Sequence, residues 1–181
     1  ATNSYTYAAD GRKLKAEIGS KTTEYCGNVI YENGALKRIL VDGGYIEGGA
    51  YYFYLTDHLG NNRVVANASG SIVQTNHYYP FGMSFAEGTV TSSQPYKYNG
   101  KELDQMHGLN MYDYSARFYE PGIGRFSTVD PLAEKFYSWS PYTYCYNNPI
   151  KFIDPDGEFP IVPIIIFVAL FLNSDVVVAP T

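Results

Sequence analysis

One short stretch combines residues that could carry chemistry with an abrupt change of composition. Residues 147–173 read NNPIKFIDPDGEFPIVPIIIFVALFLN, so Asp154 and Asp156 lie in a Pro/Gly turn directly before an almost wholly apolar segment. Two carboxylates that lie close together and share a proton can hydrolyse a peptide bond, one as general base and the other as acid. We interpret the turn as a processing junction and the segment after it as cargo or its remnant.

The same residues have a structural explanation that is far more common. Asp-Pro and Asp-x-Gly are ordinary turn formers, because Pro fixes φ and Gly tolerates positive φ. His58, His77 and His107 are scattered, and neither Cys26 nor Cys145 has metal-ligand spacing around it. We therefore expect no metal and no cofactor. The two cysteines permit one disulfide without requiring it, and packing is the expected role of both.

Composition favours strands over helices as the elements that position these residues. The 181-residue chain is 17% aromatic, with 19 Tyr, 17 Gly and 10 Pro. Tyr is favoured in strands, while Gly and Pro mark turns. The net charge of −5 argues against a nucleic-acid partner, which would need clustered Lys and Arg. Arg12, Lys13 and Lys15 form a small patch that we interpret as a solvated strand face.

An irregular repeat organises the chain. Residues 5–14, 52–65 and 96–103 share the pattern Tyr-x-Tyr, then a turn that carries Asp or Asn with Gly, then alternating polar and apolar residues. Such a unit predicts a β-hairpin that places Tyr5 and Tyr7 on one face. Repeated hairpins build a continuous sheet, which must close, curl or be capped because open edges invite aggregation.

The predicted fold is therefore mainly β and has three parts. Residues 1–95 are expected to form repeat hairpins that curl into a partial β-shell, with Gly-rich loops at residues 42–49 and 87–94. Residues 96–158 are expected to form a compact Tyr/Pro/Gly-rich module with at most short helices, one of them capped by Asp130 with Pro131 at its first position. Residues 159–181 form an apolar tail.

The tail is a poor candidate for a membrane span. Fourteen helical residues, 159–172, would cover roughly 21 Å of a hydrocarbon core about 30 Å thick. Pro160 and Pro163 interrupt the segment further. We expect residues 164–172 to be a buried strand or helix, or a piece of a longer apolar region. Because the chain opens inside a repeat unit, we also expect it to be the C-terminal piece of a longer protein.

Three motifs in order carry a resemblance to a known family. They are YYFYLTDHLGNNRVV, NHYYPFGM and YKYNGKELDQMHGLNMYDYSARFYEPGIGRFSTVDPLAEKFYSWSPYTYCYNNPIKFIDPDGE. This run resembles the core domain of rearrangement hotspot (Rhs) proteins, and most of all the version common in Bacteroidetes. The resemblance covers residues 51–158 strongly and the first fifty loosely. It implies a hollow shell of Tyr-Asp repeats that encloses a variable C-terminal region, which in many members is a toxin.

The resemblance also implies a site. In the family, the core domain often cuts the chain after a motif resembling Asp-Pro-x-Gly-Leu. The matching residues here are the catalytic pair Asp130 and Asp154, with Arg117 as the orienting cation and Glu158 and Phe159 at the junction. Glu158 replaces the motif's Leu, which puts cleavage in doubt.

The implied partners are the chain's own upstream repeat shell and its tail, together with secretion machinery and an immunity protein. Secretion or a cell-surface location is expected, and a membrane is not. Two alternatives stay open beside the self-cleaving shell. One is a non-enzymatic orphan module with a structural or cell-surface binding role, and the other is a membrane-perturbing tail.

Overall fold

The first half of the protein is a meander in which each strand pairs with the next. The computed structural model describes residues 3–89 and 94–163. Within residues 3–89, ten antiparallel strands form one sheet in chain order. They are β1 (Asn3–Tyr7), β2 (Lys13–Ile18), β3 (Lys21–Cys26), β4 (Val29–Glu32), β5 (Ala35–Val41), β6 (Gly44–Glu47), β7 (Ala50–Thr56), β8 (Asn62–Asn67), β9 (Ile72–Tyr78) and β10 (Ser84–Thr89).

The repeat pattern predicts two of these hairpins correctly. The unit at Tyr5 forms β1 and β2, and the unit at Tyr52 forms β7 and β8. In the first turn, Gly11 has a φ of +80°, a conformation that side chains with a Cβ disfavour. A Gly at this position therefore allows the chain to reverse tightly.

The third unit, at Tyr96, also reverses as a tight hairpin, because Tyr96 and Glu102 form an antiparallel bridge around the 3-10 turn Tyr98–Gly100. Two other local predictions are wrong. Residues 42–49 are not a loop, since they contain β6. Asp130 does not cap a helix, because the short 3-10 helix Ala133–Lys135 begins after Leu132.

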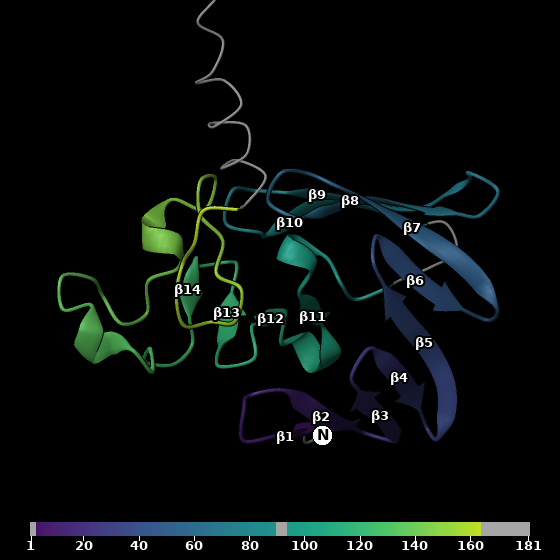
Figure 1. Ribbon diagram of the computed structural model, residues 1–181, viewed down its shortest axis with the longest axis horizontal. Helices are drawn as coiled ribbons and strands as arrows, with labels where there is room; N and C mark the ends of the chain where they lie inside the picture. Colours follow the sequence, from purple (N-terminus) through teal and green to yellow (C-terminus); the bar gives the residue numbers. More distant parts are fainter. Residues whose placement is uncertain (1–2, 90–93, 164–181) are drawn as a thin grey trace, which may run out of the picture.

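The second half of the chain forms a smaller sheet that the first sheet surrounds. Its four antiparallel strands are β11 (Glu102–Asp104), β12 (Met111–Asp113), β13 (Phe118–Glu120) and β14 (Arg125–Phe126). In Figure 1 the long sheet curls from β1 through β5 and β6 to β10 and places β11–β14 on its concave side. In the described residues, every helix is a three-residue 3-10 turn, namely Tyr98–Gly100, Met106–Gly108, Ala133–Lys135 and Cys145–Asn147. The mainly β fold class, with a curled sheet, a compact module and only short helices, is confirmed.

Tyrosine supplies most of the core. Around β11–β14, seven buried aromatic rings pack mainly edge to face, and Tyr114, Tyr119 and Tyr144 are fully buried. Such ring pairs contribute roughly 0.5–1.5 kcal/mol each beyond the area that they bury. A smaller cluster of Tyr45, Val65 and Val73 lies within the long sheet. The high Tyr content is therefore explained by packing.

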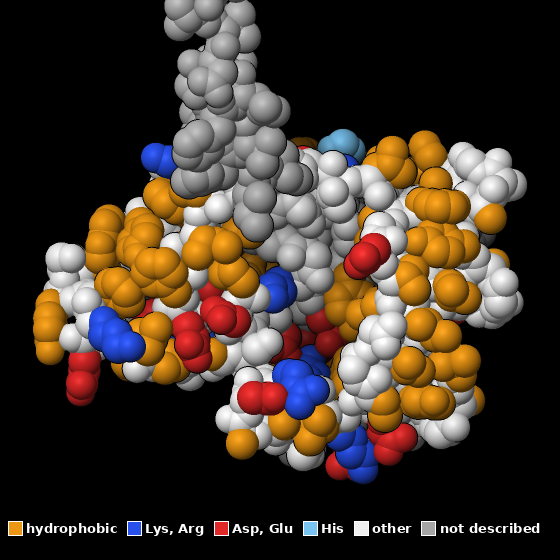
Figure 2. Space-filling model, in the orientation of Figure 1, with side chains coloured by type: hydrophobic (Ala, Val, Ile, Leu, Met, Phe, Trp, Pro, Cys, Tyr) orange, Lys and Arg blue, Asp and Glu red, His pale blue; other side chains and the backbone are white. Residues whose placement is uncertain are grey.

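A buried ion cluster joins the two sheets. Lys13 on β2 lies 2.9 Å from Glu102 and 2.7 Å from Asp113, and its side chain is only 9% exposed. Tyr25 donates a hydrogen bond to Glu102 and Tyr7 donates one to Asp113. The prediction of a solvated patch is thus wrong for Lys13. Figure 2 shows acidic and basic side chains gathered between the curled sheet and the smaller one.

The two cysteines differ in exposure. Cys145 is buried and Cys26 is exposed, both with free thiols, so the packing role predicted for Cys26 is wrong. Phe53 and Leu55 of β7 are exposed on the long sheet. Figure 2 shows apolar side chains gathered over this sheet. In the part of the chain that is described, no helix combines the length and apolarity that crossing a bilayer requires. Residues 164–172, for which a strand or helix is expected, lie outside the described residues.

Candidate functional site

Three segments that are distant in sequence meet around the Arg117 guanidinium. Arg117 directly precedes β13, and Asp130 follows β14 in a turn. Asp154 begins the turn of residues 154–157. The Asp130 amide donates to the Pro141 carbonyl at 3.0 Å, which fixes its turn against the chain before the third segment. The three residues that the sequence assigns to the site are therefore brought together.

Each nitrogen of the Arg117 guanidinium donates a hydrogen bond. Nη2 lies 2.8 Å from Asp130 Oδ2 and 3.8 Å from Asp154 Oδ2. Nε donates to the Gly157 carbonyl at 2.5 Å, and Nη1 donates to the Pro141 carbonyl at 3.0 Å. One planar cation thus holds both carboxylates and the backbone of the junction in a fixed geometry.

A ring contact fixes the plane of the guanidinium. Arg117 Cζ lies 3.7 Å from the centroid of the Phe126 ring, which is the distance of a stacked cation–π contact. Burial lowers the pKa of Arg117, although the charge of Asp130 opposes that shift. A guanidinium stays charged in proteins at neutral pH.

Asp154 is the buried member of the pair. It is 1% exposed, and its Oδ1 accepts the amides of Asp156, Gly157 and Glu158 at 3.3, 2.8 and 3.2 Å. Its Oδ2 is buried without a hydrogen-bond partner among the described residues. Burial raises the pKa of Asp154, although the backbone hydrogen bond from Gly157 and the Arg117 charge lower it. A carboxyl in this position is suited to hold a proton.

Asp130 is the more exposed member. Its Oδ1 accepts the Leu132 amide at 2.7 Å, and its side chain is 16% exposed. The pair is therefore asymmetric, with one carboxyl buried and the other in contact with solvent. That difference in environment is what separates an acid from a base when two carboxylates act together.

The junction itself is held on both sides. Gly157 has a φ of +84°, and a Cβ there would lie 3.1 Å from the Tyr114 carbonyl oxygen, so this position requires Gly. After the junction, Phe159 packs against Phe136 with ring centroids 5.4 Å apart. Ile161 then pairs with Ile153 through two backbone hydrogen bonds of 2.9 and 2.7 Å. The strand-like pairing holds the chain on the far side of the peptide bond that joins Glu158 to Phe159.

Lys101 lies beside the site, although no sequence pattern indicates that it does. Lys101 donates a hydrogen bond from Nζ to the Pro155 carbonyl, 54 residues away along the chain. Burial lowers the pKa of Lys101, while the Asp154 charge opposes the shift, so the amine lies within electrostatic reach of that carboxyl. A lone Lys in a strand sequence carries no pattern from which this contact could be predicted.

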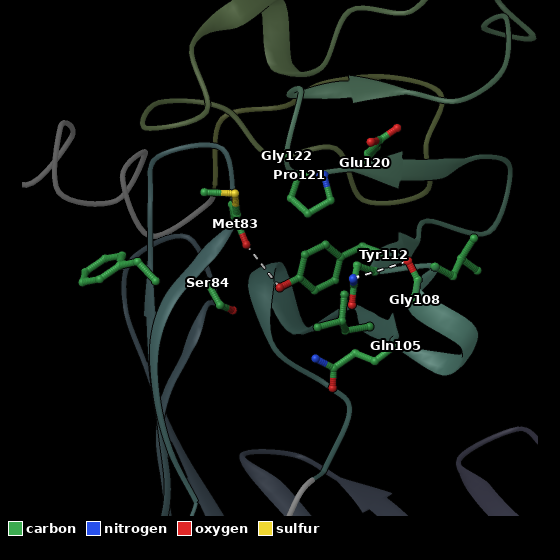
Figure 3. A pocket seen from close by; sticks show the side chains of 13 residues that line it. Met83, Ser84, Gln105, Gly108, Tyr112, Glu120, Pro121 and Gly122 are labelled. Atoms are coloured by element: carbon green, nitrogen blue, oxygen red, sulfur yellow. Dashed lines mark hydrogen bonds between the residues drawn. The ribbon is translucent and has the colours of Figure 1, made fainter.

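A cavity of about 570 Å³ lies away from the carboxylate pair, between the start of β10 and the β11–β12 hairpin. Figure 3 shows Ser84 and Met83 on one wall and Gln105 and Tyr112 on the other. Its only acidic lining residue is Glu120, so it lacks the paired carboxylates that hydrolysis needs. The described residues also contain no group of three His, Cys, Asp or Glu side chains that could hold a metal ion.

The curled tyrosine-rich sheet, wrapped around a small sheet with a carboxylate pair beside it, defines a segment of a β-shell protein. The Teneurin YD-shell family model matches residues 30–152. The chain belongs to this family.

Two relatives show the range of proteins that contain such a segment. Salivary gland surface protein 1 of Aedes aegypti is 33% identical over 133 residues, which is 72% of this chain and 4% of that protein. Toxin subunit YenC1 of Yersinia entomophaga is 31% identical over 112 residues, or 59% of this chain and 11% of that protein. The chain thus spans a small fraction of the relatives that it matches.

Solved structures share the fold. The crystal structure of TcdB2-TccC3-Cdc42 superimposes with a TM-score of 0.72 at 22% identity, over 86% of this chain and 9% of that one. The crystal structure of TcdB2-TccC3 gives a TM-score of 0.71 with the same identity and coverage.

Proposed function

We propose that this chain is the C-terminal part of an Rhs-type toxin shell, which encloses the segment after residue 158 and releases it by self-cleavage. The relatives support a toxin context, because they include Toxin subunit YenC1 and Double-stranded DNA deaminase toxin A. In this proposal residues 1–95 are shell wall, residues 96–158 are the module that carries the site, and residues 159–181 begin the cargo. The partners would be the upstream shell, a secretion machine and an immunity protein, and the product would act outside the producing cell.

One observation carries the catalytic part of the proposal. The Arg117 guanidinium contacts Asp130, Asp154 and the Gly157 carbonyl at once, directly before the bond between Glu158 and Phe159. A structural turn needs neither a second carboxyl nor a stacked cation beside it. Burying such groups costs several kcal/mol per ion before pairing is counted, so a role beyond turn formation is the better explanation.

The reaction would be hydrolysis of one peptide bond. A water molecule attacks the Glu158 carbonyl carbon while Asp130, as carboxylate, takes one of its protons. Asp154 gives its proton to the Phe159 nitrogen, the C–N bond breaks, and the products are a Glu158 carboxyl terminus and a Phe159 amino terminus. The proton that Asp130 gained leaves to solvent and Asp154 is reprotonated, so the pair returns to its starting state.

A second candidate is a non-enzymatic scaffold of the same shell. Glu158 stands where the family motif has Leu, so the residue before the bond is acidic rather than apolar. In that case the Arg117 cluster would serve only to fix the module in place. The intact chain would then act as a binding or structural module, which glycan-array binding would support.

Mass measurement separates the two candidates. The purified chain is incubated at neutral pH beside Asp130→Asn, Asp154→Asn and a Glu158→Leu variant. Self-cleavage predicts a fragment that ends at residue 158 and a second one that begins at Phe159, with neither formed by the two Asn variants. Asp156→Asn is the matched control, because Asp156 lies in the same turn without contacting Arg117. An intact mass for both wild type and Glu158→Leu would remove the protease and leave the scaffold.

A further inference from the structure

A small cavity adjoins the junction on the side of Asp130. Its volume is about 30 Å³, and Asp130, Tyr146, Glu158 and Pro160 contribute to its wall. A water molecule needs roughly 10–15 Å³ of such space and two to four polar partners. The cavity therefore has room for one or two water molecules between the exposed carboxyl of the pair and the residue whose carbonyl would be attacked.

Tyr146 contributes to the wall of this cavity. Its ring packs on Trp139 with centroids 4.9 Å apart and edge-on against Phe152 at 5.6 Å. The hydroxyl makes no hydrogen bond to any residue that the structure describes. Most tyrosine hydroxyls that lie against the core do find a partner, as Tyr114 and Tyr144 find Asn99.

The backbone that presents Tyr146 is strained. Cys145, Tyr146 and Asn147 have φ values of +48°, +51° and +57°, a run of left-handed residues without a glycine. Backbone of this kind is costly and persists only where the surroundings fix it, and it is enriched at functional sites. Burial raises the pKa of Tyr146, and the charges of Asp130 and Asp154 raise it further.

We propose that this cavity is the site of the attacking water, and that Tyr146 is a further catalytic residue whose hydroxyl holds that water together with Asp130. The inference rests on the proposed self-cleavage. The hydroxyl oxygen accepts one hydrogen bond from the water, which turns the other proton towards Asp130 and a lone pair towards the Glu158 carbonyl carbon. The balance of atoms is that of the hydrolysis above, with Tyr146 unchanged at the end.

The test compares variants that alter the water site without altering the carboxyl pair. Tyr146→Phe removes only the hydroxyl and keeps the ring contacts. Ala133→Val fills the cavity from another wall, since Ala133 lines it too. Tyr142→Phe is the control, because Tyr142 is an exposed tyrosine of the same segment. Each is made with Glu158 and with Glu158→Leu, and the rate at which the fragment starting at Phe159 appears is followed by mass spectrometry.

We expect Tyr146→Phe and Ala133→Val to slow cleavage by about tenfold, which corresponds to losing one hydrogen bond in the transition state, and Tyr142→Phe to leave the rate unchanged. Cleavage of Tyr146→Phe at the parent rate overturns the role of Tyr146 while the proposed function stands. Absence of cleavage in both parents overturns the proposed function and the inference with it. If circular dichroism shows that Tyr146→Phe is unfolded, Ala133→Val decides by the same criterion.

Discussion

At the scale of single residues, the site includes a carboxyl that lowers the stability of the fold. Asp154 is buried with an unpartnered Oδ2, and burial raises its pKa above the value in the unfolded chain. The folded state therefore holds this proton over a pH range in which the unfolded chain has lost it. Stability declines as the pH rises from the unfolded pKa to the folded pKa and then stays lower.

Asp154→Asn should reverse that loss, because the amide cannot ionise and its oxygen can still accept the three turn amides. We expect the variant to gain stability relative to wild type as the pH rises from 3 to 7, by about 1.4 kcal/mol for each unit of raised pKa. Urea unfolding at a series of pH values measures the difference, with Asp42→Asn, at an exposed aspartate, as control. A difference that is flat with pH, or that falls as the pH rises, would contradict the raised pKa.

Arg117 should be the residue whose loss is most damaging. Arg117→Met leaves Asp130 and two carbonyls without their donor and removes the cation beside Asp154, and removing one partner of a buried ion pair costs about 3–5 kcal/mol. Arg117→Lys keeps the charge but loses both the forked geometry and the stacking on Phe126, so we expect an intermediate loss. Urea unfolding of both variants at pH 7 ranks them. Equal stability of Arg117→Met and wild type would show that the cluster is not coupled to the fold.

At the scale of elements, the ion cluster between β2 and the β11–β12 pair should determine whether the two sheets stay together. Lys13→Met leaves Glu102 and Asp113 facing each other without a cation, and we expect a loss of about 3–5 kcal/mol. Lys15→Met is the matched control on the same strand. Its pair with Glu17 is exposed, and such pairs contribute little.

Hydrogen exchange should locate the effect in β1, β2 and β11–β12. The two acidic partners raise the pKa of Lys13 against the effect of burial, so its contribution is fully present below the unfolded pKa and is lost as the pH rises through the folded one. Between pH 6 and 9 the difference between Lys13→Met and wild type should therefore not change with the ionisation of Lys13. Equal exchange rates in the two lysine variants would rule out the coupling.

The elements also show how far local sequence can predict this fold. The units at Tyr5, Tyr52 and Tyr96 all reverse as hairpins, because a turn that carries Gly between alternating residues suffices to form one. The local pattern at Tyr96 does not predict where that hairpin packs: Asn99 donates its side-chain amide to the Leu59 carbonyl and its backbone amide to Asn61. These contacts span about forty residues, so no local pattern could predict them.

The candidate site was predictable for a different reason. Asp130, Asp154 and Arg117 were singled out by their register in a long motif, since their local sequences indicate only turns. The sequence does not predict Tyr146 and Lys101 as site residues, because nothing distinguishes them among 19 Tyr and the other lysines. Long-range geometry alone selects them.

At the scale of the whole molecule, the proposed parts 1–95 and 96–158 share too much structure to unfold separately. Tyr78, from the first part, belongs to the same buried cluster as Tyr98 and Tyr112 of the second. Asn62 also donates its backbone amide to the Lys97 carbonyl at 3.0 Å. A boundary crossed by a common core and by backbone hydrogen bonds predicts a single cooperative transition.

The single tryptophan makes this prediction measurable. Trp139 reports on the second part by fluorescence, while far-UV circular dichroism reports mostly on the ten-stranded sheet. We expect both signals to change at the same urea concentration. Asn99→Ala breaks hydrogen bonds between the parts and leaves buried groups unsatisfied, which should lower the free energy of unfolding by about 1–3 kcal/mol. Both urea midpoints should then fall together. Two separated midpoints would instead mean that the shell wall and the module fold independently. The Arg117 cluster would then be held by residues 96–158 alone, because all its contacts lie there.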